Sequence, residues 1–152
     1  MLVLTTALGA IRLVLHRDAA PATVAHVTAL AASRVFDGAA TFYRSDFVIQ
    51  CGLHGSGKSS PLPNLAKNEA RSCGRSNTRG AMAVAHWDVP DNGNSEFFIS
   101  LKSNGHLDTA YGGYCVFATV APGDAASFAV VDAIAAAVLR GEKPVVTSMA
   151  VE

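Results

Sequence analysis

Two stretches of sequence decide the fold: Phe42-Tyr43-Arg44-Ser45-Asp46-Phe47-Val48-Ile49-Gln50, and a longer one from Arg79 to Phe117. The longer stretch contains Arg79-Gly80-Ala81-Met82-Ala83-Val84-Ala85, Asn94-Ser95-Glu96-Phe97-Phe98-Ile99-Ser100, His106-Leu107-Asp108 and Tyr114-Cys115-Val116-Phe117. In both, apolar residues alternate with polar ones or stand beside an Arg, Gln or Glu, which is typical of strands that show polar side chains on an apolar face. An arginine half-buried among aromatic residues loses several kcal/mol of hydration free energy unless it has a partner, so we expect Arg44 to have a task.

The composition indicates a single domain that needs no scaffold of disulfides or metals. The chain has 152 residues, of which 50% are hydrophobic and 16% charged, and its formal net charge is zero. A chain of this length can bury a core of its own. Lys and Arg do not cluster, which argues against a nucleic-acid groove and against a membrane-binding basic patch. Cys51, Cys73 and Cys115 are too few and too scattered for a disulfide framework, so we expect buried or free thiols in a reducing compartment.

The N-terminal residues do not resemble a signal peptide. Met1-Leu2-Val3-Leu4 is apolar but has no basic residues before it, and Thr5, Thr6 and Gly9 interrupt the run. No stretch approaches the roughly 20 apolar residues of a transmembrane helix. We therefore expect a cytoplasmic or nuclear protein with no membrane partner, although a chain from which a targeting segment had been removed would look the same.

The remaining pattern predicts many short strands and two helices. Val24, Val27 and Leu30 recur at helical spacing after Pro21, a residue tolerated in a first helical turn, and Asp37-Gly38 ends that unit. A second, alanine-rich helix should run over residues 125–139. Such elements favour a β-barrel capped by helices. The expected strands are 1–6 and 10–16 as a hairpin, then 41–51, 80–86, 95–100, 114–120 and 144–151, and residues 52–79 form a long loop.

One motif suggests a different function, nucleotide binding. Residues Gly52 to Ser59 match the phosphate-binding pattern GxxxxGK[ST], and a predicted strand precedes them. That chemistry needs the loop to continue into a helix whose N–H groups face the phosphates. Here Ser60-Pro61-Leu62-Pro63 follows, and each proline disfavours helical backbone in the residue before it. We therefore expect a Gly/Ser-rich loop and no nucleotide site.

The histidines do not have the spacing of a metal site. His16, His26, His54, His86 and His106 form no HxxxH or HExxH pattern. The sequence also has no Gly-x-Ser-x-Gly elbow for a nucleophilic serine. We expect neither a metal nor a cofactor.

The order of the two deciding stretches resembles that of the cyclophilins, the peptidyl-prolyl cis–trans isomerases. In that family a Phe-His-Arg segment leads to Phe-Met-x-Gln-Gly-Gly, and here Phe42-Tyr43-Arg44 leads to Phe47-Val48-Ile49-Gln50-Cys51-Gly52. The family's Ser-Gln-Phe-Phe-Ile corresponds to Ser95-Glu96-Phe97-Phe98-Ile99. The similarity spans nearly the whole chain, and residues 63–80 are closer to bacterial-type members than to animal ones. It implies a mainly β fold, a closed eight-stranded antiparallel barrel capped by two α-helices, as one domain over residues 1–152.

The resemblance also implies roles for individual residues. Arg44 takes the position of the catalytic arginine, and Gln50 that of the polar residue which supports the arginine and the substrate backbone. Phe98 takes the position of the floor of the proline pocket. The other substrate-binding positions match Phe47 and Val48 as lining residues, Ala85 and His86 as the segment that pairs with the substrate backbone, Glu96, His106, and Leu107 and Tyr114 as two further walls.

Two departures from the family pattern concern the arginine. The family usually has four residues between its arginine and the next Phe, whereas this chain has only Ser45 and Asp46, which could move Arg44 relative to Phe47. Glu96 replaces a glutamine, and its carboxylate accepts hydrogen bonds but cannot donate one to a substrate carbonyl. That carboxylate could instead pair with Arg44. We expect a Glu96→Gln variant to turn over faster because it regains a donor.

Two further departures concern the pocket walls. His106 stands where many members have a tryptophan that helps to hold cyclosporin, which implies weak cyclosporin binding. Tyr114 replaces a histidine, as it does in bacterial-type members.

The expected function is therefore peptidyl-prolyl cis–trans isomerisation of Xaa-Pro bonds in proteins, assisting folding or conformational switching, by a monomer without a cofactor. Its partners would be exposed Pro-containing segments of client proteins. The short Arg44–Phe47 link and Glu96 favour an alternative, a cyclophilin-fold module that binds Pro-containing peptides and turns them over slowly.

Overall fold

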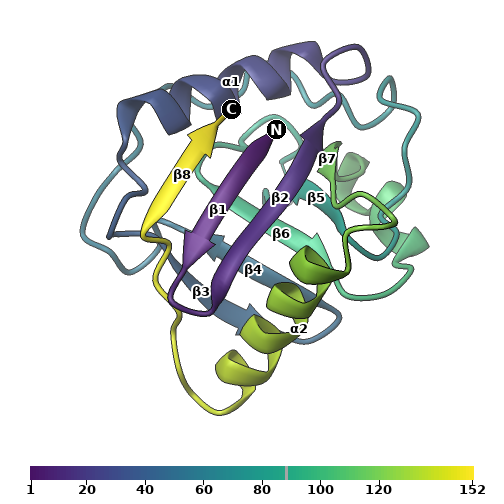
Figure 1. Ribbon diagram of the computed structural model, residues 1–152. Coiled ribbons are helices and arrows are strands. Elements are labelled where there is room, and N and C mark those ends of the chain that lie inside the picture. The colour runs from purple at the N-terminus through teal and green to yellow at the C-terminus, as the bar shows by residue number, and fades with distance from the viewer. Residues whose placement is uncertain (88) are drawn as a thin grey trace.

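The computed structural model describes residues 1–87 and 89–152, which form one antiparallel eight-stranded sheet and two α-helices (Figure 1). The strands are β1 Leu2–Thr6, β2 Gly9–Leu15, β3 Thr41–Ser45, β4 Val48–Gly52, β5 Ala81–Val84, β6 Glu96–Ser100, β7 Val116–Thr119 and β8 Ser148–Val151. The helices are α1 Pro21–Ser33 and α2 Ala125–Leu139, and two short 3-10 helices are η1 Gly105–Asp108 and η2 Ala110–Gly112. The predicted mainly β fold with eight antiparallel strands and two helices is confirmed.

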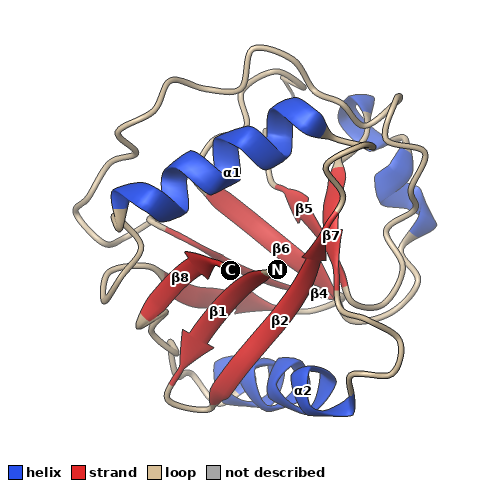
Figure 2. Ribbon diagram, turned by 45° about the horizontal axis from the view of Figure 1, so that its top comes forward, coloured by secondary structure: helices blue, strands red, loops and turns tan. Residues whose placement is uncertain are grey.

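The sheet curls strongly, and α1 and α2 lie at its opposite ends (Figure 2). Its strand order is β3-β4-β6-β5-β7-β2-β1-β8, so β3 and β8 are the outer strands. The segment before β8 brings these two edges together. Phe42 N–H donates to Pro144 O at 2.9 Å and Val146 N–H donates to Ala40 O at 2.8 Å, on either side of a bridge between residues 41 and 145.

Helix α1 is held to the sheet by one buried face and capped from a distant loop. Val24, Val27 and Leu30 are buried, as their spacing predicts. Pro21 is its first residue. Its free N–H groups are satisfied by the Glu69 carboxylate, which accepts from Thr23 N at 2.7 Å. Because Glu69 lies in the long loop, this contact ties the loop to the barrel.

The stretch 41–51 is not one strand, as its pattern predicts, but two. Strands β3 and β4 form a hairpin that turns at Asp46 and Phe47. The Asp46 side chain supplies the turn, because its Oδ1 accepts the Val48 N–H at 3.1 Å. Periodicity alone misses this turn, because apolar residues on both sides of Arg44-Ser45-Asp46 favour a single strand.

Other boundaries shift by a few residues. Helix α1 ends at Ser33 rather than at Asp37-Gly38, because Arg34 takes a left-handed conformation with φ 60°. Strand β8 begins at Ser148 rather than at 144, since residues 144–146 serve the edge of β3. Helix α2 matches its predicted bounds, and Asp124 caps it by accepting Ser127 N–H at 3.0 Å.

The long loop is confirmed: residues 53–80, all of them described, contain neither helix nor strand. The segment after Ser59 is irregular, so the phosphate-binding pattern does not lead into a helix. Cys51, Cys73 and Cys115 are buried free thiols. In the described chain, no helix is long and apolar enough to cross a membrane.

The sheet has an apolar cluster on each of its two faces. The larger one fills the barrel and includes Phe42, Ile49, Phe97, Ile99 and Met82. The smaller one lies on the opposite face of β4, β5, β6 and β7 and consists of Val48, Ala81, Ala83, Phe98, Leu107 and Val116, with Phe47, Ala85 and Tyr114 packed against it. Residues that alternate along one strand belong to the two clusters in turn, as the pleat requires.

Candidate active site

A row of residues crosses the outer face of the sheet from a cation to an apolar floor. Arg44 on β3 pairs with Gln50 on β4, Gln50 with Phe98 on β6, and Phe98 with Ala83 on β5. Directly paired residues on adjacent strands point to the same face. The sheet register therefore sets Arg44, Gln50 and Phe98 side by side, although 54 positions separate the first from the last.

A β-bulge at Tyr43 explains how Arg44 reaches this face. Phe42 pairs with Cys51, but the next pair joins Arg44 to Gln50, so Tyr43 and Arg44 together oppose one residue of β4. Without the extra residue, Arg44 would point into the barrel beside Phe42. The bulge instead gives the outer face two consecutive polar side chains.

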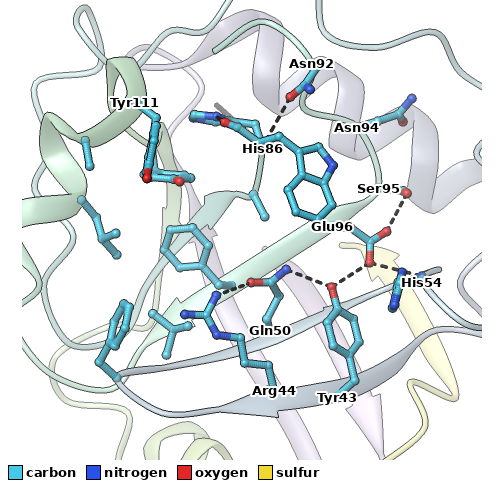
Figure 3. Close-up of a pocket in the computed structure, with 18 of the residues that line it drawn as sticks. Tyr43, Arg44, Gln50, His54, His86, Asn92, Asn94, Ser95, Glu96 and Tyr111 are labelled. Carbon is cyan, nitrogen blue, oxygen red and sulfur yellow. Dashed lines mark hydrogen bonds between the residues drawn. The ribbon is translucent and has the colours of Figure 1, made fainter. Parts of the chain in front are cut away.

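These residues border a pocket of about 630 Å³ (Figure 3). All eleven residues predicted for the site line it: Arg44, Phe47, Val48, Gln50, Ala85, His86, Glu96, Phe98, His106, Leu107 and Tyr114. The prediction omitted others that line it as well: Tyr43, His54, Trp87, Asn92, Asn94, Ser95, Ala110 and Tyr111. Strict alternation puts Tyr43 and Arg44 on opposite faces of the strand, so a prediction that places Arg44 in the pocket leaves Tyr43 out. Most of the others come from irregular segments that carry no periodic signal.

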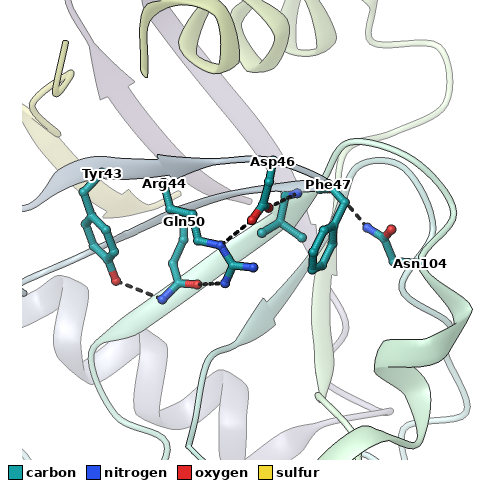
Figure 4. A network of polar contacts seen from close by, with 7 residues as sticks. Tyr43, Arg44, Asp46, Phe47, Gln50 and Asn104 are labelled. Carbon is teal, nitrogen blue, oxygen red and sulfur yellow. Dashed lines mark hydrogen bonds and ion pairs between the residues drawn. The ribbon is translucent and has the colours of Figure 1, made fainter. Parts of the chain in front are cut away.

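The Arg44 guanidinium is held by the hairpin itself (Figure 4). Its Nε donates to Asp46 Oδ2 at 2.8 Å, and its Nη1 donates to Gln50 Oε1 at 3.2 Å. Its Cζ atom lies 5.2 Å from the centre of the Phe47 ring, so the short Ser45-Asp46 link does not separate Arg44 from Phe47. The Arg44 side chain is 42% exposed, so it lies at the rim of the pocket and is less buried than its aromatic neighbours suggest.

The Glu96 carboxylate does not pair with Arg44, contrary to the sequence-based expectation. Its Oε1 accepts from Tyr43 Oη at 2.9 Å and from His54 N at 3.2 Å. Its Oε2 accepts from Leu53 N at 3.1 Å and from Ser95 Oγ at 2.8 Å. These four donors hold the carboxylate against the turn that follows β4.

Aromatic side chains form the other walls. Tyr114 packs edge-on against Phe98, with ring centres 5.5 Å apart, and stacks on His86 at 4.2 Å. His106 lies edge-on to Phe47 at 5.2 Å. Leu107 is buried behind them in the smaller cluster. The result is an apolar recess with one cation at its edge.

Backbone contacts fix the segments that carry these walls. Phe47 O accepts the Leu101 N–H and Asn104 Nδ2, both at 3.0 Å, which anchors the hairpin turn (Figure 4). Ala85 N–H donates to Glu96 O at 2.8 Å, so it is already used within the sheet. His86 Nε2 lies 2.8 Å from Gly113 O, which joins the segment after β5 to the end of η2.

Two tyrosines of the pocket, Tyr43 and Tyr114, hold their protons more strongly than a free tyrosine does. Burial, followed by the nearby Glu96 charge, raises the pKa of Tyr43 far above its usual value. Burial and Tyr111 also raise the pKa of Tyr114. Tyr43 can therefore donate its proton in a hydrogen bond to Glu96. Among the described residues, no three His, Cys, Asp or Glu side chains come together as a metal site.

Comparisons with known proteins agree on one family. The family model for "Cyclophilin type peptidyl-prolyl cis-trans isomerase/CLD" matches residues 1–152. A peptidyl-prolyl cis-trans isomerase of Acinetobacter baylyi is 31% identical over 132 residues, covering 81% of this chain and 67% of that protein. Another, from Streptomyces antibioticus, is 35% identical over 143 residues, covering 86% of this chain and 80% of that protein.

A solved structure has the same fold at lower identity. It is a cyclophilin-type isomerase of Cryptosporidium parvum, crystallised in the presence of the dipeptide Ala-Pro, with a TM-score of 0.75 and 19% identity. The match covers 99% of this chain and 98% of that one.

Proposed function

This chain belongs to the cyclophilin-type peptidyl-prolyl cis–trans isomerase family, and from this we propose that Arg44 is its catalytic residue and that the pocket beside it binds Pro-containing segments of proteins. The observation that carries the proposal is the row Arg44–Gln50–Phe98, which sets a cation next to an apolar floor. The floor suits a prolyl ring, and the cation suits the prolyl nitrogen.

The reaction asks for no nucleophile. An Xaa-Pro bond rotates over a barrier of about 20 kcal/mol and isomerises unaided in tens of seconds. Twisting the bond ends amide resonance, so the lone pair returns to the prolyl nitrogen, which becomes basic. An Arg44 N–H directed at this nitrogen binds the twisted amide more strongly than the planar one, and only such a difference accelerates the reaction.

Arg44 alone is not enough. A 10⁵-fold acceleration corresponds to roughly 7 kcal/mol, whereas a hydrogen bond from a charged group contributes about 1.5–3 kcal/mol. The walls must contribute the rest by fixing the ring while the preceding residue rotates. We assign that task to Phe47, Phe98, Leu107 and Tyr114, with Gln50 supporting the arginine.

The substrates we propose are exposed Pro-containing segments of client proteins. The pocket is open to solvent, and two exposed aromatic side chains, Trp87 and Tyr111, stand at its edge. The Ala-Pro dipeptide present with the Cryptosporidium parvum relative is consistent with this choice. We propose that the protein acts as a single domain in the cytoplasm, since three unpaired cysteines suit a reducing compartment.

A protease-coupled assay on an Xaa-Pro peptide tests the proposal. We expect Arg44→Ala to lose at least nine-tenths of kcat/KM, roughly the worth of one charged hydrogen bond, with an almost unchanged melting temperature. Arg140→Ala is the matched control, because Arg140 pairs with Glu142 at the end of α2, away from the pocket. Full activity in Arg44→Ala would overturn the proposed mechanism. Slow turnover with tight peptide binding in the unmodified protein would favour the binding-module alternative.

A further inference from the structure

We propose that Glu96 and Tyr43 are positioning residues for the isomerase reaction: together they fix the direction of the Gln50 amide and, through it, the Arg44 guanidinium. The inference rests on the proposed role of Arg44. It assigns a role to the carboxylate that replaces the expected glutamine and to Tyr43, which lies beside Arg44 on the outer face.

Four side chains form one continuous chain of hydrogen bonds (Figures 3 and 4). Tyr43 Oη donates to Glu96 Oε1 at 2.9 Å. Gln50 Nε2 donates to Tyr43 Oη at 2.9 Å, and Arg44 Nη1 donates to Gln50 Oε1 at 3.2 Å. The chain runs across three strands, from β6 to β3 and β4, and ends at the guanidinium.

The two ends of the chain fix its polarity. A carboxylate only accepts hydrogen bonds and a guanidinium only donates them, whereas a hydroxyl and an amide can do either. Glu96 therefore obliges Tyr43 to donate to it, which leaves the Tyr43 oxygen to accept from the Gln50 NH₂ group. The Gln50 carbonyl then faces Arg44, as that donor requires. Both ends demand the same orientation of the amide.

The Glu96 end of the chain is rigid. Three further donors, Leu53 N, His54 N and Ser95 Oγ, hold the carboxylate in place. Gly52 packs directly against it, and a β-carbon at that position would overlap the carboxylate. A fixed acceptor at one end keeps the chain from relaxing when substrate arrives.

The bulge lets Gln50 contact both neighbours at once. Tyr43 and Arg44 are consecutive yet lie on the same face, opposite Gln50. Among the described residues, Tyr43 is the acceptor found for Gln50 Nε2, which leaves its second N–H for a substrate carbonyl. A reversed amide would present its NH₂ group to Arg44 and lose both functions.

The inference reverses the sequence-based expectation for Glu96→Gln. A glutamine at 96 can donate to Tyr43, so Tyr43 can turn its proton towards Gln50 and the amide can reverse. We expect Glu96→Gln and Tyr43→Phe each to lower kcat/KM about two- to tenfold, the worth of one intramolecular hydrogen bond. Glu142→Gln is the charge-matched control, because it removes one surface carboxylate at the end of α2.

The decisive measurement is a double-mutant cycle with Gln50→Ala. If Glu96 and Tyr43 act through Gln50, their substitution costs nothing further in the Gln50→Ala background. Equal losses in both backgrounds, or no loss in the native one, would overturn the inference. A merely structural role of Glu96 in holding the 52–54 turn predicts those equal losses.

A second measurement reads the amide directly. The side-chain NH₂ resonances of Gln50 should shift in Tyr43→Phe as well as in Glu96→Gln and stay in place in Glu142→Gln; unshifted resonances in Tyr43→Phe would contradict the chain. Failure of this inference is distinct from failure of the proposed function. In the first case Arg44→Ala is still inactive while Tyr43→Phe is not impaired, and in the second Arg44→Ala itself retains full activity.

Discussion

Arg44 Nε donates to Asp46 Oδ2 at 2.8 Å, two positions further along the same hairpin. Asp46 also makes the turn, because its other oxygen accepts the Val48 N–H. The Asp46 side chain thus stabilises the tight turn between Arg44 and Phe47 and also orients the Arg44 guanidinium. With Nε bound to Asp46 and one N–H of Nη1 bound to Gln50, Nη2 of the proposed catalytic residue makes no hydrogen bond within the described part of the chain.

We expect Asp46→Asn to lower kcat/KM about two- to fivefold, because a half-exposed ion pair is worth up to about 1 kcal/mol. An asparagine keeps an oxygen for the Val48 N–H, so the turn survives while the arginine loses its carboxylate. The measurement is steady-state kinetics on an Xaa-Pro peptide. Asp132→Asn, which breaks a similar surface pair with Arg79, is the control and should be silent. Equal rates in both variants would show that Asp46 does not orient Arg44.

We expect Gly52→Ala to lower both stability and activity. The new methyl group would overlap the Glu96 carboxylate and the Ser95 carbonyl oxygen, so one of them must move. Overpacking of this kind costs about 1–3 kcal/mol, which thermal unfolding would detect. Gly123→Ala is a fair comparison, since nothing lies within 4 Å of a β-carbon there. A stable and fully active Gly52→Ala protein would mean that Glu96 has more freedom than its four donors suggest.

We expect the contribution of Asp108 to stability to disappear in acid. Burial alone would raise the pKa of Asp108, but hydrogen bonds from Ser76 and Asn77 outweigh burial and lower it. The unfolded chain therefore binds this proton more readily than the folded one. The contribution of Asp108 is complete above its unfolded pKa of about 4 and is lost as the pH falls through the lower folded value. Denaturant unfolding of the native protein and Asp108→Asn should differ at pH 7 and converge near pH 2; a constant difference would contradict this.

We expect His106→Trp to tighten cyclosporin binding. His106 lies at the pocket edge, with its ring 5.2 Å from that of Phe47, so an indole there would enlarge the apolar wall. Titration calorimetry of the two proteins measures the change. Equal affinities would indicate that His106 is not what limits binding of the drug.

Much of the fold follows from local sequence. The apolar face of α1 at Val24, Val27 and Leu30, the bounds of α2 and the irregular loop after Gly52 are all predictable, since each depends on residues close together in the chain. The cap of α1 is not, because Glu69 reaches Thr23 from 46 positions away. The hairpin at Asp46 is missed because apolar residues on both sides of Arg44-Ser45-Asp46 favour a single strand.

The site residues that could be predicted are those that match family positions or follow the alternation of a strand. Arg44, Gln50 and Phe98 belong to that group, and the register then sets them in a row. Tyr43 could not be predicted together with Arg44, because strict alternation puts consecutive residues on opposite faces and only the bulge puts both on the outer face. The predicted pairing of Glu96 with Arg44 was wrong for a similar reason. Only the three-dimensional structure shows that the carboxylate accepts hydrogen bonds from Tyr43 and from the backbone of residues 53–54 instead.

The hydrogen bonds at the edge of β3 imply that the active site is completed late in the synthesis of the chain. That edge is completed by hydrogen bonds to residues 144–146, which leave the ribosome a hundred residues after Arg44. At about 5–20 residues per second, the delay is roughly 5–20 s, which approaches the lifetime of an uncatalysed prolyl isomer. A nascent copy therefore lacks the finished site during that interval. Isomerisation at its own prolines is then uncatalysed, or is catalysed by a copy that has already folded.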